Sequence, residues 1–336
     1  MKILLCYGTR PEWIKIKPLL NAFKQEGIEY SVLNVRQHTS LLEENSEVNY
    51  VLNIEDSTSN KNRLDSIVGN IANIPQLAFH EVTHVLVQGD TATALMCSIA
   101  AFNRQIPVIH LEAGLRTYDL KNPYPEEAYR QMISRIASIH LCPTEQNALN
   151  LKSEHVNGII NVVGNTVLDN LLDLRKQLSY GNEVLITLHR RENHDKINNW
   201  FEIISQIAIA NPNIVYTLPI HPNPNVLKHK DLLKNVNIIS ALPYDQFLKR
   251  LIACRYLISD SGGIQEEASF LGKKVIVCRK ITERPETVGL NSILCSEPSN
   301  LVSIEEELKN NYIIEPNNTY GDGYSSIKIA KLLKNI

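Results

Sequence analysis

The composition of this 336-residue chain excludes several classes of protein. Its 43% hydrophobic and 21% charged residues are typical of globular proteins. No apolar run approaches the roughly 20 residues that cross a bilayer, so no membrane partner is expected. A net charge of −2 provides no basic field for nucleic acid. The length exceeds that of one ordinary core and predicts two domains.

The amino terminus and the cysteines predict a reduced, cytoplasmic protein. Residues 1–7 form a short apolar run with one lysine and no following cleavage site, which favours a first strand over a signal peptide. The cysteines form no C-x-x-C pair, so we expect reduced core residues. They are Cys6, Cys97, Cys142, Cys254, Cys278 and Cys295.

The first half of the chain alternates β-branched runs with helical patterns. Helices are expected from Pro11, from Thr91 and from Pro125, with others between the remaining strands. The strands are expected at residues 2–8, 30–35, 84–89, 107–112, 139–144 and 158–165. This βαβ order predicts a parallel, doubly wound α/β sheet.

A second series of the same kind begins near Glu183. Its helices are expected around Trp200, over residues 244–255 and from Gly262. Its strands are expected at residues 183–190, 214–221, 235–243, 256–261 and 273–279. A second Rossmann-like sheet follows from this repetition.

The connecting and terminal segments give the domain organisation. Residues 165–183 are expected to form a helix that ends at Gly181 and links the two series. We place the domains at 1–166 and 167–321. The short amphipathic helix of 322–336 is expected to pack back on the first domain, and a cap on the second is the alternative.

Ligands of parallel sheets bind outside the carboxyl ends of the strands, so the residues that follow each strand are candidates. The first strand ends at Gly8 and Thr9, and the helix that follows carries Arg10 and Lys15 near its start. A helix amino terminus with two cations suits a phosphate group. An ordinary turn with solvated charges is the alternative.

Three carboxylates follow neighbouring strands of the first half. Asp90 also suits the N-cap of a helix, and Glu126 suits a first helical turn. Glu112 closes an apolar strand and has no such simple explanation. Together the three would converge on one crevice, where an enzyme needs acids and bases.

The second half offers a candidate phosphate site. Ser261, Gly262 and Gly263 open a helix whose free N–H groups can hold a diphosphate, and Glu267 one turn further can accept hydrogen bonds from a ribose. This is no G-x-G-x-x-G motif, so no nicotinamide or flavin cofactor is expected.

Histidines at strand ends have two interpretations. His189 and His221 end the first two strands of the second series and could stabilise the charge of a leaving group. A buried histidine bonded to the backbone is the alternative. His80 and His84 lack a helix and further ligands, so no metal site is expected.

A series of motifs runs in order from Gly8 to Gly323: GTRPE, QGDT, HLEAGLRT, NPYPEEAYR, PTE, GNTV, LHRREN, IHPNPNV, SDSGGIQEEA, TERPE and YGDG. Together they resemble the non-hydrolysing UDP-N-acetylglucosamine 2-epimerases over nearly the whole chain. The resemblance implies a glycosyltransferase-B type fold, with two Rossmann-like domains and a central cleft. It also implies a homodimer and no cofactor.

The resemblance implies a mechanism as well. A base removes the proton on carbon 2 while UDP leaves carbon 1 by anti elimination, which gives 2-acetamidoglucal. Reprotonation on the other face and syn addition of UDP yield UDP-N-acetylmannosamine, a precursor for surface polysaccharides or other glycans. Matched motif by motif, the catalytic set is Asp90, Glu112, Glu126, His189 and Lys15. The set that binds UDP or substrate is Arg10, Arg116, His189, His221, Ser261, Gly262, Gly263 and Glu267.

Several alternatives and departures stay open. A 6-deoxy or otherwise modified UDP-N-acetylhexosamine is the nearest rival substrate, although the full-length loop at 114–127 favours the plain sugar. A hydrolysing epimerase and a glycosyltransferase of the same fold are further alternatives. Gln88 and Trp13 depart from the family pattern. Gln37 and Arg191 match an allosteric site of some members, whereas Thr39 and Ser40 do not.

Overall fold

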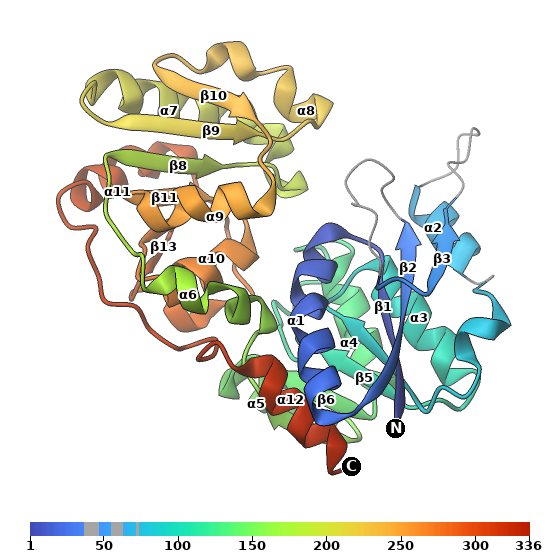
Figure 1. The fold of residues 1–336 in the computed structure, drawn as a ribbon. Coiled ribbons are helices and arrows are strands. Elements are labelled where there is room, and N and C mark those ends of the chain that lie inside the picture. Colours follow the sequence, from blue (N-terminus) through green and yellow to red (C-terminus); the bar gives the residue numbers. More distant parts are fainter. Residues whose placement is uncertain (37–46, 55–62, 72–73) are drawn as a thin grey trace. The chain divides into compact units, whose positions relative to one another are not determined.

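A computed structural model describes residues 1–36, 47–54, 63–71 and 74–336 (Figure 1). The segment with Gln37, Thr39 and Ser40 lies outside these residues. The chain divides into two compact units, Met1–Asn170 with Gly321–Ile336, and Leu171–Tyr320. No described helix is both long and apolar enough to span a bilayer.

The first unit is built on a parallel sheet of seven strands, within the part of the chain that is described. Its order is β3-β2-β1-β4-β5-β6-β7. The strands are β1 Lys2–Tyr7, β2 Glu29–Arg36, β3 Tyr50–Asn53, β4 His84–Gln88, β5 Val108–Leu111, β6 Ile139–Cys142 and β7 Ile159–Val162. The order reverses at β1, and the predicted doubly wound α/β fold is confirmed.

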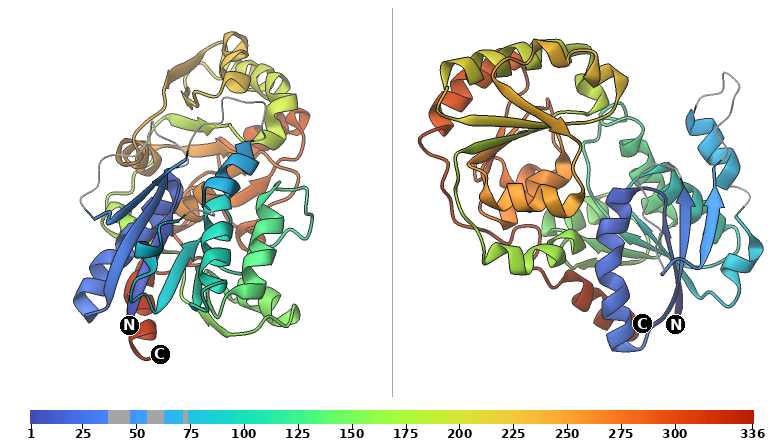
Figure 2. Two further views of the ribbon diagram at one scale, coloured as in Figure 1. Left: turned by 90° about the vertical axis from the view of Figure 1, so that its right-hand side faces the viewer. Right: turned by 45° about the horizontal axis from the view of Figure 1, so that its top comes forward.

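Helices cover both faces of this sheet (Figures 1 and 2). Alternate residues of β1 enter two cores, because successive side chains of a strand point to opposite faces. Ile3 and Leu5 join a core on one face of the sheet, and Leu4 and Cys6 join a core on the other face. The helices are α1 Arg10–Glu26, α2 Arg63–Ile71, η1 Gln76–Phe79, α3 Ala92–Phe102, α4 Glu126–Ile136, α5 Glu145–Ser153, η2 Thr166–Leu171 and α12 Ser325–Lys334.

The second unit repeats the architecture on a six-stranded parallel sheet of order β10-β9-β8-β11-β12-β13. The strands are β8 Glu183–Thr187, β9 Val215–Ile220, β10 Val236–Ser240, β11 Tyr256–Ser259, β12 Val275–Val277 and β13 Ser292–Leu294. Trp200 and Phe201 of α7 fill its core. The helices are α6 Leu172–Arg175, η3 Arg191–Lys196, α7 Ile197–Ala210, α8 Pro224–Leu227, η4 Lys230–Leu232, α9 Tyr244–Ala253, α10 Gly262–Phe270, η5 Pro285–Thr287, η6 Pro298–Asn300 and α11 Leu301–Leu308.

Some elements differ from the sequence prediction. The prediction of a helix that ends at Gly181 is wrong, because the α-helix in this segment ends at Arg175. The N–H groups of Ser179 and Gly181 donate instead to carbonyls near the end of α9. The strands β3 and β13 were not predicted, because both are short and lie at sheet edges, where few residues carry the alternation.

The carboxyl-terminal segment belongs to the first unit. Helix α12 lies beside α1 in Figure 1, and Ile329, Ala330 and Leu333 enter the same core. Asp169 binds the start of α12 by accepting from the N–H groups of Ser325 (3.0 Å) and Ser326 (2.7 Å). Burial raises the pKa of Asp169, and these hydrogen bonds oppose the rise. A half-buried carboxylate therefore holds the start of α12.

Truncation of Leu333 tests how much α12 stabilises the first unit. Leu333 is 1% exposed, so Leu333→Ala is expected to lower the free energy of unfolding by about 2–5 kcal/mol. Ile327→Ala on the exposed face of the same helix is expected to change it by less than about 0.5 kcal/mol. Urea unfolding measures both, and equal effects would contradict the observed packing.

Candidate active site

The carboxyl ends of β4 and β5 bring two of the predicted acids to one edge of the first sheet. Gln88 pairs with Leu111, and the N–H of Gly89 donates to the Leu111 carbonyl at 3.0 Å. Asp90 and Glu112 follow directly. Glu112 has a φ of 66°, a left-handed conformation that is costly for a residue with a Cβ. Such strain at a strand end is a feature of functional sites.

The buried carboxylate of Glu112 binds Lys15 of α1. The Lys15 ammonium lies 2.6 Å from Oε1 and 2.7 Å from Oε2, and the two side chains are 13% and 5% exposed. The amides of Gln88 and Asn165 also donate to this carboxylate. The structure therefore joins Lys15 and Glu112, which the sequence analysis placed in one site.

Asp90 has a different partner, Arg130 of α4. The Nε and Nη2 of Arg130 donate to Oδ2 of Asp90 at 3.0 and 2.5 Å. The alternative role of Asp90 as an N-cap is wrong, because Thr91 caps α3 by accepting from the N–H of Ala94 at 3.1 Å. Arg130 was missed in the sequence. Its place four residues after Glu126, on the same helical face, was the available signal.

Glu126 and Glu127 look alike in sequence but differ in surroundings. Glu126 is the first residue of α4 and is half-buried. Glu127 is fully buried and accepts from the N–H groups of Thr117 (3.0 Å) and Tyr118 (3.1 Å). Glu127 thus holds the preceding loop, and Glu126 is the carboxylate of the pair that solvent reaches.

A further buried carboxylate, Glu12, shapes the phosphate candidate at the start of α1. It accepts from the N–H groups of Gly8 (3.0 Å) and Thr9 (2.7 Å) and from the hydroxyl of Thr91 at 2.7 Å. Burial raises the pKa of Glu12, which these hydrogen bonds oppose. Arg10, half-buried, is the first residue of the helix that this capping box begins. The T-x-x-E spacing was the signal for Glu12.

The predicted role of Arg116 in substrate binding is not supported by its surroundings. Its side chain is fully buried, and its Nε and Nη2 donate to the two carboxylate oxygens of Glu154 at 2.7 and 2.9 Å. Nη2 also donates to Ser134, and Nη1 to the Leu115 carbonyl. Arg116 therefore ties α4 and α5 to its own loop.

In the second unit, Ser261 is the N-cap of α10, whose first turn contains Gly262 and Gly263. A Cβ on Gly262 would lie 2.4 Å from Nη1 of Arg284, so only glycine fits there. A Cβ on Gly263 would meet no atom within 4 Å, which leaves that side of the helix start open. The N–H groups of this turn can therefore meet an anion.

Buried ion pairs lie next to the start of α10. Arg284 donates to Glu266 and to Glu283, both at 2.5 Å, and Arg279 donates to Glu283 at 2.8 Å. Glu267, at 6% exposed, accepts from the Tyr244 hydroxyl at 2.7 Å. Glu267, the residue predicted to bind a ribose, therefore already has a polar partner on α9.

His189 and His221 lie together at the carboxyl ends of β8 and β9. Their rings stack with centroids 5.5 Å apart. Buried Asp260 accepts from the N–H groups of His189 and Arg190 at 2.9 and 2.8 Å, and its Oδ1 lies 3.5 Å from Nδ1 of His189. Burial lowers the pKa of both histidines, and the negative charge of Asp260 opposes this shift. Near pH 7 the rings are therefore neutral and can donate a hydrogen bond.

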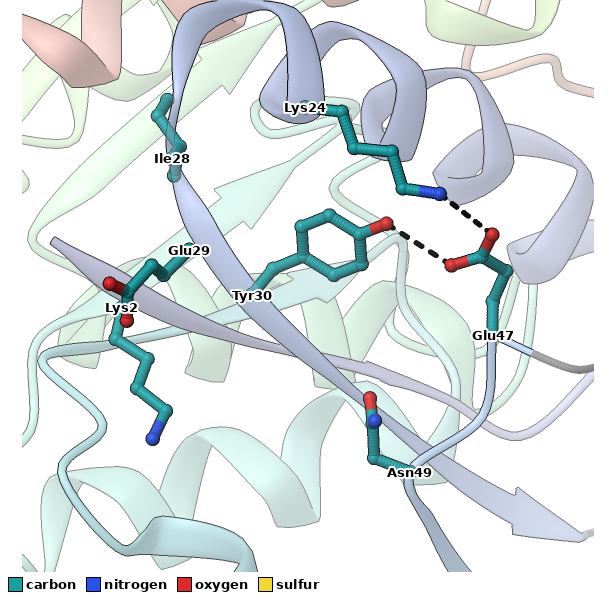
Figure 3. A pocket seen from close by; sticks show the side chains of 7 residues that line it. All are labelled: Lys2, Lys24, Ile28, Glu29, Tyr30, Glu47 and Asn49. Carbon is teal, nitrogen blue, oxygen red and sulfur yellow. Dashed lines mark hydrogen bonds and ion pairs between the residues drawn. The ribbon is translucent and has the colours of Figure 1, made fainter.

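Two other features lie outside this site. Among the described residues, no group of His, Cys, Asp or Glu side chains is arranged to hold a metal ion. A hollow of about 440 Å³ lies at the opposite end of the first sheet, where β1 and β2 begin (Figure 3). Lys24 and Tyr30 bind Glu47 there at 2.8 and 3.1 Å. Since polar side chains already pair across it, this hollow is no candidate for the chemistry.

Comparison with known proteins shows the family of this chain. The model of a family described as UDP-N-acetylglucosamine 2-epimerase matches residues 24–334. The chain belongs to the UDP-N-acetylglucosamine 2-epimerase family. This is a family of isomerases, and the resemblance seen in the motifs is confirmed.

Individual members of the family are similar over their full length. The chain is 36% identical to the UDP-N-acetylglucosamine 2-epimerase of Campylobacter jejuni, over 99% of this chain and 97% of that protein. It is 35% identical to that of Escherichia coli K12, over 100% and 99%. The crystal structure of the Neisseria meningitidis epimerase bound to UDP-GlcNAc superposes with a TM-score of 0.86, at 35% identity over 100% of both chains. The glycosyltransferase-B type fold is thereby confirmed for this family member.

A pH-dependent stability follows from His110, the histidine of the HLEAG motif. Its Nε2 donates to the Gly89 carbonyl at 2.8 Å, next to Asp90, and burial lowers its pKa from 6.5 to about 3. Because the folded pKa lies below the unfolded one, the stability that this group contributes is complete above pH 6.5. It is lost as the pH falls toward 3.

Between pH 7.5 and 4.5 the loss of unfolding free energy due to His110 is expected to be about 2–3 kcal/mol. His110→Gln keeps a donor for the Gly89 carbonyl but does not titrate, so its stability should fall less over this range. Urea unfolding at several pH values compares the two proteins. Parallel curves would show that His110 does not cause the pH dependence.

Proposed function

We propose that this protein interconverts UDP-N-acetylglucosamine and UDP-N-acetylmannosamine without hydrolysis. In this reaction UDP is eliminated across carbons 1 and 2, and 2-acetamidoglucal stays bound until UDP adds back. The observation that carries the proposal is the pairing of Glu112 with Lys15 beside the pairing of Asp90 with Arg130, at one sheet edge. Membership of the family and the similarity to named epimerases support it.

The chemistry requires an acid–base group on each face of the sugar. A base must take the proton from carbon 2, and an acid must deliver one to the opposite face. Asp90, Glu112 and Glu126 are the candidates for these two roles. Lys15 supplies positive charge to this set through its ion pair with the buried carboxylate of Glu112.

Departure of UDP must carry much of the barrier, because no adjacent carbonyl acidifies the proton on carbon 2. Groups that stabilise the diphosphate in the transition state therefore matter most. We assign this role to Arg10, to His189 with His221 behind it, and to the first turn of α10 at Ser261, Gly262 and Gly263. Glu267 is assigned to the ribose.

Arg116 is left out of this assignment, since its guanidinium is buried against Glu154. No metal or cofactor takes part in the proposed steps. The cytoplasmic location and the homodimer stay predictions.

Deuterium exchange tests the reaction and separates it from its alternatives. With UDP-N-acetylglucosamine in deuterium oxide, we expect UDP-N-acetylmannosamine with deuterium at carbon 2, followed by proton NMR. Free N-acetylmannosamine with UDP would indicate a hydrolysing enzyme. No exchange with this nucleotide, but exchange with a 6-deoxy analogue, would overturn the substrate. Transfer to an added acceptor without exchange would indicate a glycosyltransferase.

Amide substitutions test the carboxylates. Asp90→Asn, Glu112→Gln and Glu126→Gln are each expected to lower kcat by about 10²–10⁴-fold, because each removes a proton-transfer group. Binding of UDP, measured by calorimetry, should stay within a few-fold of the wild type. Glu145→Gln at the exposed start of α5 serves as control and should keep full activity. Normal turnover in all three variants would make the assignment wrong.

A further inference from the structure

The carboxylate of Glu112 is held by the same kinds of donor on both oxygens. Oε1 accepts from the ammonium of Lys15 at 2.6 Å and from Nδ2 of Asn165 at 3.1 Å. Oε2 accepts from Lys15 at 2.7 Å and from Nε2 of Gln88. Each oxygen thus accepts from the Lys15 ammonium and from a neutral side-chain amide. We call the side chains of Gln88 and Asn165 the amide pair.

The amide pair reaches Glu112 from two different segments, and both side chains are only 3% exposed. Gln88 is the last residue of β4 and lies beside Leu111 in the register of the sheet. Asn165 follows β7 and directly precedes η2. The two segments are far apart in sequence, so only the folded unit brings both amides to Glu112.

The orientation of the Asn165 amide is set by its own surroundings. Its Oδ1 accepts from the N–H of Val167 at 3.1 Å, so the nitrogen is the end that faces Glu112. The next residue, Thr166, donates its hydroxyl to the Lys15 carbonyl at 2.5 Å. The segment that carries Asn165 is therefore fixed both to Glu112 and to the helix that carries Lys15.

Gly321 packs against the same segment. Its φ is 131°, and a Cβ there would lie 3.1 Å from Cα of Gly164 and 3.3 Å from the nitrogen of Asn165. The chain returning from the second unit thus packs against residues 164–165. A side chain at this position would be strained by the positive φ, and its Cβ would require the neighbouring atoms to move by a few tenths of an ångström.

Neutral donors act differently from Lys15. An amide hydrogen bond to a carboxylate stabilises its ionised form, and an amide does not titrate between pH 4 and 10. Lys15 is a flexible cation that can turn to an anionic ligand, whereas the amide pair stays in place. Other titratable groups near Glu112 include His110, whose pKa of about 3 keeps it neutral in the working range.

We propose that Gln88 and Asn165 are positioning residues that hold the carboxylate of Glu112 and set its proton affinity through one neutral hydrogen bond to each oxygen. The inference rests on the proposed function only in treating Glu112 as a catalytic carboxylate. The hydrogen bonds themselves belong to the free protein.

Carbon-13 NMR tests the proposal without substrate. In protein labelled at the glutamate carboxyl carbon, the Glu112 signal is identified by its loss in Glu112→Gln. In Asn165→Ala the midpoint of its titration is expected to move up by about one pH unit, because one donor to the ionised form is lost. Asn165→Asp should move it further, since a second carboxylate opposes ionisation. Gln88→Met should act like Asn165→Ala through the other oxygen.

Asn147→Ala is the matched control. Asn147 is also buried and caps α5 through Thr144, so its loss destabilises the same unit without touching Glu112. Its Glu112 midpoint should equal that of the wild type. An unchanged midpoint in both Asn165→Ala and Gln88→Met would overturn the proposal, as would an equal shift in Asn147→Ala.

Turnover separates this proposal from the proposed function. The pH–rate limb that reports Glu112 should move with the NMR midpoint in the variants, and KM should change less than kcat. If the midpoint moves while the wild-type protein shows no exchange at carbon 2, the proposed function fails and the positioning role stands. If exchange occurs but the midpoint does not move, the positioning role fails alone.

Discussion

The candidate site depends on one buried ion pair, between Lys15 and Glu112. A carboxylate taken out of water without partners costs several kcal/mol, so its place beside β5 requires donors from the rest of the unit. These come from α1, from β4 and from the segment before η2. These contacts also position the end of the sheet. One set of hydrogen bonds therefore serves both the architecture of the unit and the candidate site.

Buried and half-buried carboxylates recur through the described residues with different roles. Glu12 joins the loops after β1 and β4, Glu127 holds the loop before α4, and Asp169 binds the start of α12. Each accepts several N–H or O–H groups, which offset the cost of burial. Asp90 and Glu126 are more open to solvent than Glu12 or Glu127, whereas Glu112 is as buried as the structural acids and is distinguished by its ion pair with Lys15.

The candidate anion-binding groups of the second unit are neutral, whereas those of the first unit are charged. Its histidines have lowered pKa values through burial, and the first turn of α10 presents N–H groups with an open side at Gly263. The cations Arg279 and Arg284 are paired with glutamates. Such a set suits an anion that must both bind and leave, because hydrogen-bond donors hold it without a strong fixed charge.

The sequence alone determined the two parallel α/β sheets, since the βαβ rhythm and the turn glycines are local patterns. It also determined the family, because the motifs follow one another in order along nearly the whole chain. Strand-end positions were enough to select Asp90 and Glu112 as candidates, and the resemblance to the family added Lys15 to the catalytic set. The parallel sheet then places such residues at one edge.

Only the tertiary structure decided which residues pair. Arg116 and Arg130 are both arginines near polar motifs, yet Arg116 is buried against Glu154 while Arg130 binds Asp90. The short edge strands and the end of the helix before Gly181 also depended on tertiary hydrogen bonds. Partners distant in sequence, such as Asn165 and Glu112, meet through packing, and no local pattern encodes that distance.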